Sequence, residues 1–238
     1  EDSPTDTVHD TFQLAVHGDR PIGRPVGGTP QAIREVERAD VWEHYQAHYG
    51  PSSLIVAAAG NVDHESVCER VQAALEGSPW DAGSAASPRP RRSTTVTPIA
   101  DHDKDITRRR DVTQAHVIIG CEGLSATDPA GPTMSVLLSV LGGSMSSRLF
   151  QEVREKRGLA YTTYAFDVAY SDTGTFGMYA GCSPDKVGEV EAIMRAQLED
   201  LATDGPTEEE MTRVRGQVRG GVVLGLEDNW SRMMRLGR

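Results

Sequence analysis

The sequence predicts an α+β protein that is built from two similar units joined by a linker. Two stretches carry this prediction, because each reads as an apolar strand, a glycine, a capped turn and an amphipathic helix: LIVAAAGNVDHESVCERVQAAL at 54–75 and FGMYAGCSPDKVGEVEAIMRAQL at 176–198. Duplication of a domain produces such a repeat. Between them, residues 77–105 are rich in Pro, Ser, Ala, Gly and Arg and lose all apolar periodicity, which is typical of a linker.

The first unit is expected to be mainly helical at its start. The segment DRPIGRPVGGTP at 19–30 interrupts this pattern, because its prolines cannot all lie inside one regular helix. Thr29 followed by proline then restarts a helix, with Thr as the N-cap. The apolar run SLIVAAAG at 53–60 predicts a strand that is buried on both faces. Asp63 is expected to cap the next helix, which runs to about Leu75.

Strands and helices alternate again in the second unit. Residues 105–110 and 114–124 are expected to form two strands separated by a turn, although the first is basic for a central strand. Asp128, followed by proline, offers the cap of an apolar helix. Thr207 and Glu210 form a capping-box pattern, which predicts the start of a last helix.

The segment GGSMSSRLFQEVREKRGLAY at 142–161 is the most informative part of the chain. After the Gly-Gly break, Ser146 or Ser147 is expected to cap a short helix. Gly158 is a natural left-handed terminator of that helix, and the chain then turns extended at Ala160. The side chains expected on the buried face of the helix are Leu149, Phe150 and Val153.

Arg154 and Tyr161 lie seven residues apart across the predicted end of this helix. This placement is expected to aim a guanidinium and a phenol into one cleft. When water attacks a carbonyl group, negative charge develops on its oxygen, and positioned donors of these two kinds stabilise that charge. In the alternative interpretation, Arg154 forms a surface ion pair with Glu155 or Glu152, and Tyr161 is an ordinary aromatic residue of an edge strand.

The same segment, with its continuation TTYAFDVAYSDTGTFGMYAG at 162–181, resembles the second half of the inverted zinc metallopeptidases of the insulinase and pitrilysin superfamily. The similarity is greatest to the smaller bacterial members, which are akin to the mitochondrial processing peptidases. The resemblance implies two similar α/β-sandwich domains of the processing-peptidase/metallohydrolase type, facing each other across a cleft and both incomplete here. The parts that it assigns are the end of the metal-bearing domain at 1–77, an interdomain linker at 78–104, and a C-terminally truncated, substrate-gripping second domain at 105–238.

In that family an Arg and a Tyr at this spacing bind the substrate backbone and help to stabilise the tetrahedral intermediate, and Arg154 and Tyr161 are the matching positions. The resemblance therefore implies a fragment of a zinc-dependent endopeptidase that hydrolyses extended or unfolded peptides, with the fragment itself inactive. Pairing of the peptide with a sheet edge suits substrates of varied sequence. Two other functions stay open: a non-catalytic, peptide-binding partner subunit in a homodimer or heterodimer, and an assembly scaffold.

An inverted zinc site requires two histidines, a carboxylate ligand and a glutamate base, with one position left for water. The family motif His-x-x-Glu-His does not occur here, and the opening EDSPTDTVHDTF resembles the portion just after the family's third ligand. The ligands are therefore expected before Glu1, and no zinc is expected on this piece. His44 and His48 share one helix face but lack a glutamate in the base position, so we assign them no metal.

The composition limits the kinds of partner that the protein is expected to bind and the cellular compartment in which it is expected to work. The net charge of −11 argues against nucleic acid or an anionic membrane as a partner, because binding phosphate requires clustered basic surface. The chain contains no apolar run long enough to span a bilayer and no visible export leader, although it does not begin with Met and reads as an internal piece. The three cysteines are widely spaced, which favours a reducing compartment, the bacterial cytoplasm.

Overall fold

The computed structural model describes residues 3–51, 54–78 and 104–237. Two compact units divide the chain, the first made of residues 1–28 with 92–214, and the second of residues 29–91 with 215–238. The predicted linker at 78–104 lies almost wholly outside the described residues, so the domain boundaries stay a prediction. The predicted α+β class is confirmed, because helices and an antiparallel sheet together build the fold.

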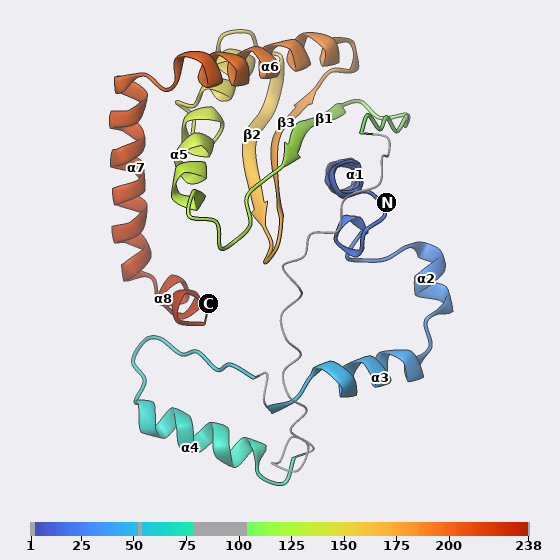
Figure 1. The fold of residues 1–238 in the computed structure, drawn as a ribbon, viewed down its shortest axis with the longest axis vertical. Helices are drawn as coiled ribbons and strands as arrows, with labels where there is room; N and C mark the ends of the chain where they lie inside the picture. Colours follow the sequence, from blue (N-terminus) through green and yellow to red (C-terminus); the bar gives the residue numbers. More distant parts are fainter. Residues whose placement is uncertain (1–2, 52–53, 79–103, 238) are drawn as a thin grey trace. The chain divides into compact units, whose positions relative to one another are not determined.

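A three-stranded antiparallel sheet organises the first unit (Figure 1). Its strands are β1 (Ala115–Glu122), β2 (Ala160–Ala169) and β3 (Gly174–Cys182), in the order β1-β3-β2. β3 lies in the centre and is buried along its whole length. Directly paired residues point to the same face of an antiparallel sheet, so Tyr164 of β2 and its partner Tyr179 of β3 lie on one face together.

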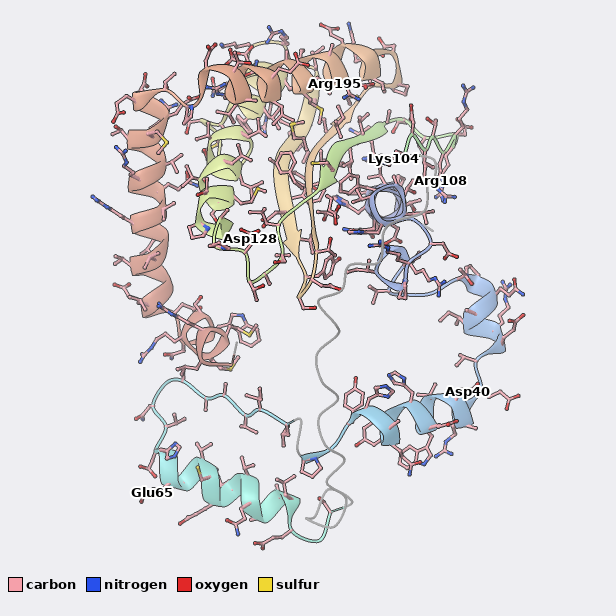
Figure 2. All side chains as sticks on the ribbon, viewed as in Figure 1. Asp40, Glu65, Lys104, Arg108, Asp128 and Arg195 are labelled. Atoms are coloured by element: carbon pink, nitrogen blue, oxygen red, sulfur yellow. The ribbon has the colours of Figure 1, made fainter. Side chains whose placement is uncertain are left out.

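Helices α5 (Gly131–Leu141) and α6 (Val187–Asp204) cover one face of this sheet (Figure 1). The cap that the sequence predicted at Asp128 is wrong, because the N-cap of α5 is Ala130 and no side chain caps this helix. Asp128 instead accepts a hydrogen bond from the N–H of Ala130 at 2.8 Å in the turn before α5 (Figure 2). The side chains in the centre of the core are completely buried: Leu141, Leu149, Val153, Met178, Ala180, Val190 and Met194.

Helix α1 (Pro4–His17) packs against the opposite face of the sheet, beside β1 (Figure 1). Phe12 meets Phe166 edge to face, with 5.8 Å between ring centroids. Gly120 makes this close packing possible, because a Cβ atom at that position would lie 2.6 Å from the ring of Phe12. The helix therefore closes the second face of the sheet with aromatic contacts.

Two of the predicted strands do not form in the structure. Residues 104–110 have no regular structure, and Arg108 donates a hydrogen bond from Nε to Thr11 Oγ1 of α1 at 3.0 Å (Figure 2). Residues 54–59 of the second unit also form no strand. A strand needs a hydrogen-bonded neighbour. The regular structure of the described part of the second unit is helical, and it provides no such neighbour.

The second unit contains α2, α3, α4, the greater part of α7, and α8, with the bounds Pro30–Glu35, Arg38–His48, His64–Leu75, Glu208–Glu227 and Asn229–Leu236. Three predicted caps are confirmed. Thr29 accepts a bond from Ala32 N at 3.1 Å, and Asp63 accepts one from Ser66 N at 2.9 Å. Thr207 and Glu210 exchange the two bonds of a capping box at the start of α7. Within the described ranges, no helix is long and apolar enough to cross a membrane.

Candidate functional site

A close approach of two backbones fixes the start of the segment that carries the predicted site residues. Gly142 follows α5 and lies against β2, where a Cβ atom on it would come within 2.1 Å of the backbone N of Ala165. Only glycine fits such a contact. The Gly-Gly pair therefore serves as a tight connection between helix and sheet.

Arg148 anchors the next part of the segment. Its guanidinium donates to both carboxylate oxygens of Glu210 at 2.7 and 2.9 Å, to Asp200 at 2.6 Å, and to the carbonyl of Gly205 at 3.2 Å. The side chain of Arg148 is 10% exposed. Its hydrogen bonds lower the pKa of Glu210 to about 2. This cluster ties the segment to the end of α6 and the start of α7, and no local pattern in the sequence indicated it.

The helix that follows is a π-helix, η3 (Phe150–Glu155), where the sequence indicated only a short helix. The bond from Lys156 N to Gln151 O, at 2.9 Å, spans five residues and defines the wider turn. The predicted serine cap is wrong, because the Ser147 hydroxyl donates to Ser144 O instead. The terminator is confirmed, since Gly158 has a φ of +61°.

Tyr161 occupies a β-bulge at the start of β2. Ala160 pairs with Cys182 and Thr162 pairs with Gly181, so Tyr161 is the extra residue between two pairs. A bulge of this kind changes the direction of a side chain and is frequent beside active sites. Tyr161 is accordingly 75% exposed.

The structure brings the two predicted residues together. The guanidinium carbon of Arg154 lies 4.7 Å from the centroid of the Tyr161 ring, a cation–π contact. Glu155 is 3.7 Å from Arg154 Nε, a long ion pair between partly exposed groups. Glu152 is engaged by Lys156 at 2.5 Å. Within the part of the chain that the structure describes, the Arg154 side chain donates no hydrogen bond, so its N–H groups are available to a ligand.

A hollow of about 290 Å³ adjoins Tyr161. Its lining includes Thr5, His116, Tyr161, Thr162, Tyr164 and Tyr179. Two of its groups are held by a hydrogen bond of 2.7 Å between His116 Nδ1 and the Tyr179 hydroxyl. Burial raises the pKa of Tyr164, so its phenol stays neutral at ordinary pH. The hollow therefore offers hydroxyl, imidazole and aromatic groups to a polar ligand.

The described residues do not fit a zinc centre. His44 and His48 of α3 do stack, with ring centroids 4.2 Å apart, but His48 Nδ1 is within hydrogen-bond distance of the His44 carbonyl, at 2.9 Å. No group of three or more His, Cys, Asp or Glu side chains able to hold a metal occurs among the residues that the structure describes. We therefore assign no step of a reaction to a metal held by them.

The family is shown by comparison with known proteins. Residues 35–218 match the family described as "Peptidase M16 inactive domain". The chain therefore belongs to the peptidase M16 family, and the resemblance seen in the sequence is confirmed at this level. The fold agrees: a protease from Helicobacter pylori covers 96% of the chain with a TM-score of 0.79 at 18% identity, and an M16 inactive domain from Pseudomonas fluorescens covers 99% with a TM-score of 0.77 at 19% identity. The chain covers 56% and 54% of these two structures.

Curated relatives carry similar names. A protein of Streptomyces coelicolor named "Uncharacterized zinc protease" is 46% identical over the whole chain, which covers 52% of that protein. The uncharacterized zinc protease YmxG of Bacillus subtilis is 31% identical over the whole chain, which covers 56% of it. The chain thus spans about half the length of the curated relatives that it matches.

Proposed function

We infer that the full-length protein is a zinc-dependent metalloendopeptidase that hydrolyses extended or unfolded peptides, and that this chain supplies substrate-binding and transition-state-stabilising groups. The contact between Arg154 and Tyr161 carries the proposal, because it presents a cation and a phenol side by side on an exposed surface. Membership of the M16 family and the names of the relatives support the reaction class.

The chemistry assigned to this chain is the stabilisation of negative charge. As a peptide carbonyl is attacked, its oxygen becomes an anion, to which the Arg154 guanidinium and the Tyr161 hydroxyl would donate hydrogen bonds. Loss of one such donor lowers kcat by about 10²–10³ in well-studied sites. Metal binding and activation of water belong to residues outside this chain, so the piece by itself would not hydrolyse peptides.

The substrate would lie along β2. This strand is at the edge of the three-stranded sheet, and Tyr161 is at its beginning, where the pairing with β3 is irregular. A peptide added as a strand gains main-chain hydrogen bonds that do not depend on its sequence. A cytoplasmic location in a bacterium and a homodimer or heterodimer belong to the same proposal; the three cysteines, all free, fit a reducing compartment.

The test uses the full-length protein loaded with zinc and an unstructured peptide whose cleavage is followed by mass spectrometry. Arg154→Ala and Tyr161→Phe are expected to lower kcat by about 10²–10³ without unfolding the protein. Arg195→Ala is the matched control, because this arginine lies on α6 and pairs only with Glu191 among the described residues (Figure 2). Turnover at the level of the control in both variants would reject the role given to the pair.

The same experiment separates the alternative function. A non-catalytic partner subunit of the same fold would bind the peptide, as measured by fluorescence anisotropy, yet would release no cleavage product. In that case Arg154→Ala would weaken binding of the peptide, whereas no variant would change hydrolysis.

A further inference from the structure

The Arg154 guanidinium lies close to two aromatic rings. Its guanidinium carbon lies 4.6 Å from the centroid of Phe150 and 4.7 Å from that of Tyr161. Phe150 was expected on the buried face of its helix together with Leu149 and Val153. Those two neighbours are completely buried, whereas Phe150 is half-buried and does not belong to the core of the described residues. Its ring contacts the site through the Arg154 guanidinium.

The spacing of Phe150 and Arg154 within η3 explains how the Phe150 ring reaches the guanidinium. Phe150 and Arg154 are the first and fifth residues of η3. Residues four apart are neighbours on the surface of a helix. The ring of Phe150 thus faces the Arg154 side chain from the same turn, while the bulge of β2 brings Tyr161 from the other element.

We propose that Phe150 is a positioning residue, which holds the Arg154 guanidinium against Tyr161 in readiness for the substrate. An arginine side chain is long and flexible, and ordering it at the moment of binding would weaken the interaction with the substrate. Stacking between two rings restricts the side chain beforehand and leaves its N–H edge for hydrogen bonds. Arg148 differs from Arg154 in this respect, because its guanidinium donates hydrogen bonds to Glu210, Asp200 and Gly205.

The expected effect of Phe150 on catalysis rests on the proposed function. The position of the Arg154 side chain can be measured independently of that function. In arginine-labelled full-length protein, NMR reports the Hε and Hδ signals of Arg154, which are assigned by their loss in Arg154→Lys. Ring currents are expected to shift these signals upfield in the natural protein. Phe150→Leu should move them toward the values of a free arginine, while Phe150→Tyr, which keeps the ring, should retain them. The Arg148 signals serve as an internal control for the fold.

Turnover of the unstructured peptide completes the test. Phe150→Leu is expected to lower kcat by about two- to fivefold, the fold-change that corresponds to the loss of one exposed cation–π contact, with KM nearly unchanged. Phe150→Tyr, which keeps the ring, is expected to retain the kcat of the natural protein. If Phe150→Leu does not fold, Phe150→Trp keeps the test decisive, because the larger ring must shift the Arg154 signals further upfield.

Three outcomes are distinguishable. Arg154 signals that do not respond to the residue at position 150 would overturn the inference. A rise in KM alone, with unchanged Arg154 signals, would also overturn it, because Phe150 would then contact the substrate directly. If the signals respond as expected but Arg154→Ala leaves turnover intact, the positioning stands and the proposed function fails.

Discussion

His9 and Tyr164 lie 155 positions apart in the chain, and the His9 Nε2 and Tyr164 Oη atoms are 2.9 Å apart in the fold. The His9 ring also stacks on Tyr179, with 5.7 Å between ring centroids. These contacts fasten α1, from the beginning of the chain, to the sheet that carries Tyr161. The candidate site therefore depends on residues from distant parts of the sequence.

The close approach at Gly142 predicts a large difference between two glycine substitutions. Gly142→Ala would place a Cβ atom 2.1 Å from the backbone of Ala165, so we expect a loss of about 1–3 kcal/mol or more in the free energy of unfolding. Gly188→Ala is the control, because its Cβ atom would meet nothing within 4 Å in α6, and it should be neutral or stabilise the helix by up to about 1 kcal/mol. Urea denaturation of the full-length protein measures both; equal stabilities would contradict the contact.

The pKa of Glu210 predicts how stability changes in acid. Its folded-state pKa is about 2, below the ordinary value of 4.5, so the folded state favours the charged carboxylate. This contribution is present above pH 4.5 and is lost as the pH falls toward 2. For a side chain 13% exposed, we expect it to be about 1–3 kcal/mol. Glu210→Gln should lose most of that stability at pH 7 and show a flatter acid limb; an unchanged acid limb would refute the assignment.

The ion cluster of Arg148 predicts strong coupling between two substitutions. Arg148→Met would leave Glu210 partly buried without its cation and is expected to cost about 3 kcal/mol. Adding Glu210→Gln should then cost little more, since the interaction is already lost. A double-mutant cycle in urea measures the coupling energy. Strictly additive effects would show that the two side chains act independently.

The buried imidazole of His17 predicts a second pH dependence, near neutrality. His17 is completely buried, and neither ring nitrogen has a hydrogen-bond partner among the described residues. Burial lowers its pKa below 6.5, while the nearby Glu122 carboxylate acts in the opposite direction. The unfolded chain therefore takes up the proton first, and stability falls as the pH drops below 6.5.

His17→Leu should remove this contribution, so its free energy of unfolding is expected to fall less between pH 7 and pH 5 than that of the natural protein. His48→Gln, at an exposed position on α3, is the control and should keep the natural pH dependence. The interpretation is abandoned if His17→Leu and the natural protein lose equal stability over this range.

Much of the local structure was predictable, because its signals lie within a few residues of one another. The caps at Thr29, Asp63 and Thr207 follow from side-chain oxygens placed three residues before a backbone N–H. The spacing of Arg154 and Tyr161 across a helix end and a strand start predicted their meeting. The role of that pair stays a prediction until turnover is measured.

Other features were not predictable from these patterns. The apolar run at 54–59 has the composition of a buried strand, but strand formation requires a neighbour that the described part of its unit lacks. The predicted serine cap does not form, and the Ser147 hydroxyl instead donates a hydrogen bond to the carbonyl of Ser144. The cluster around Arg148 joins residues more than fifty positions apart, for which a single sequence carries no signal.

The sequence by itself determined the α+β class, the family resemblance, and the two residues to test, because each of these depends on motifs and on the spacing of residues close together in the chain. Only the tertiary structure decided that a β-bulge places Tyr161 beside the Arg154 guanidinium, that the Phe150 ring also contacts it, and that α1 covers one face of the sheet. The physical reason is that hydrogen-bond shifts of one residue, and packing between distant elements, depend on the balance of contacts in the folded chain and leave no pattern in the order of its residues.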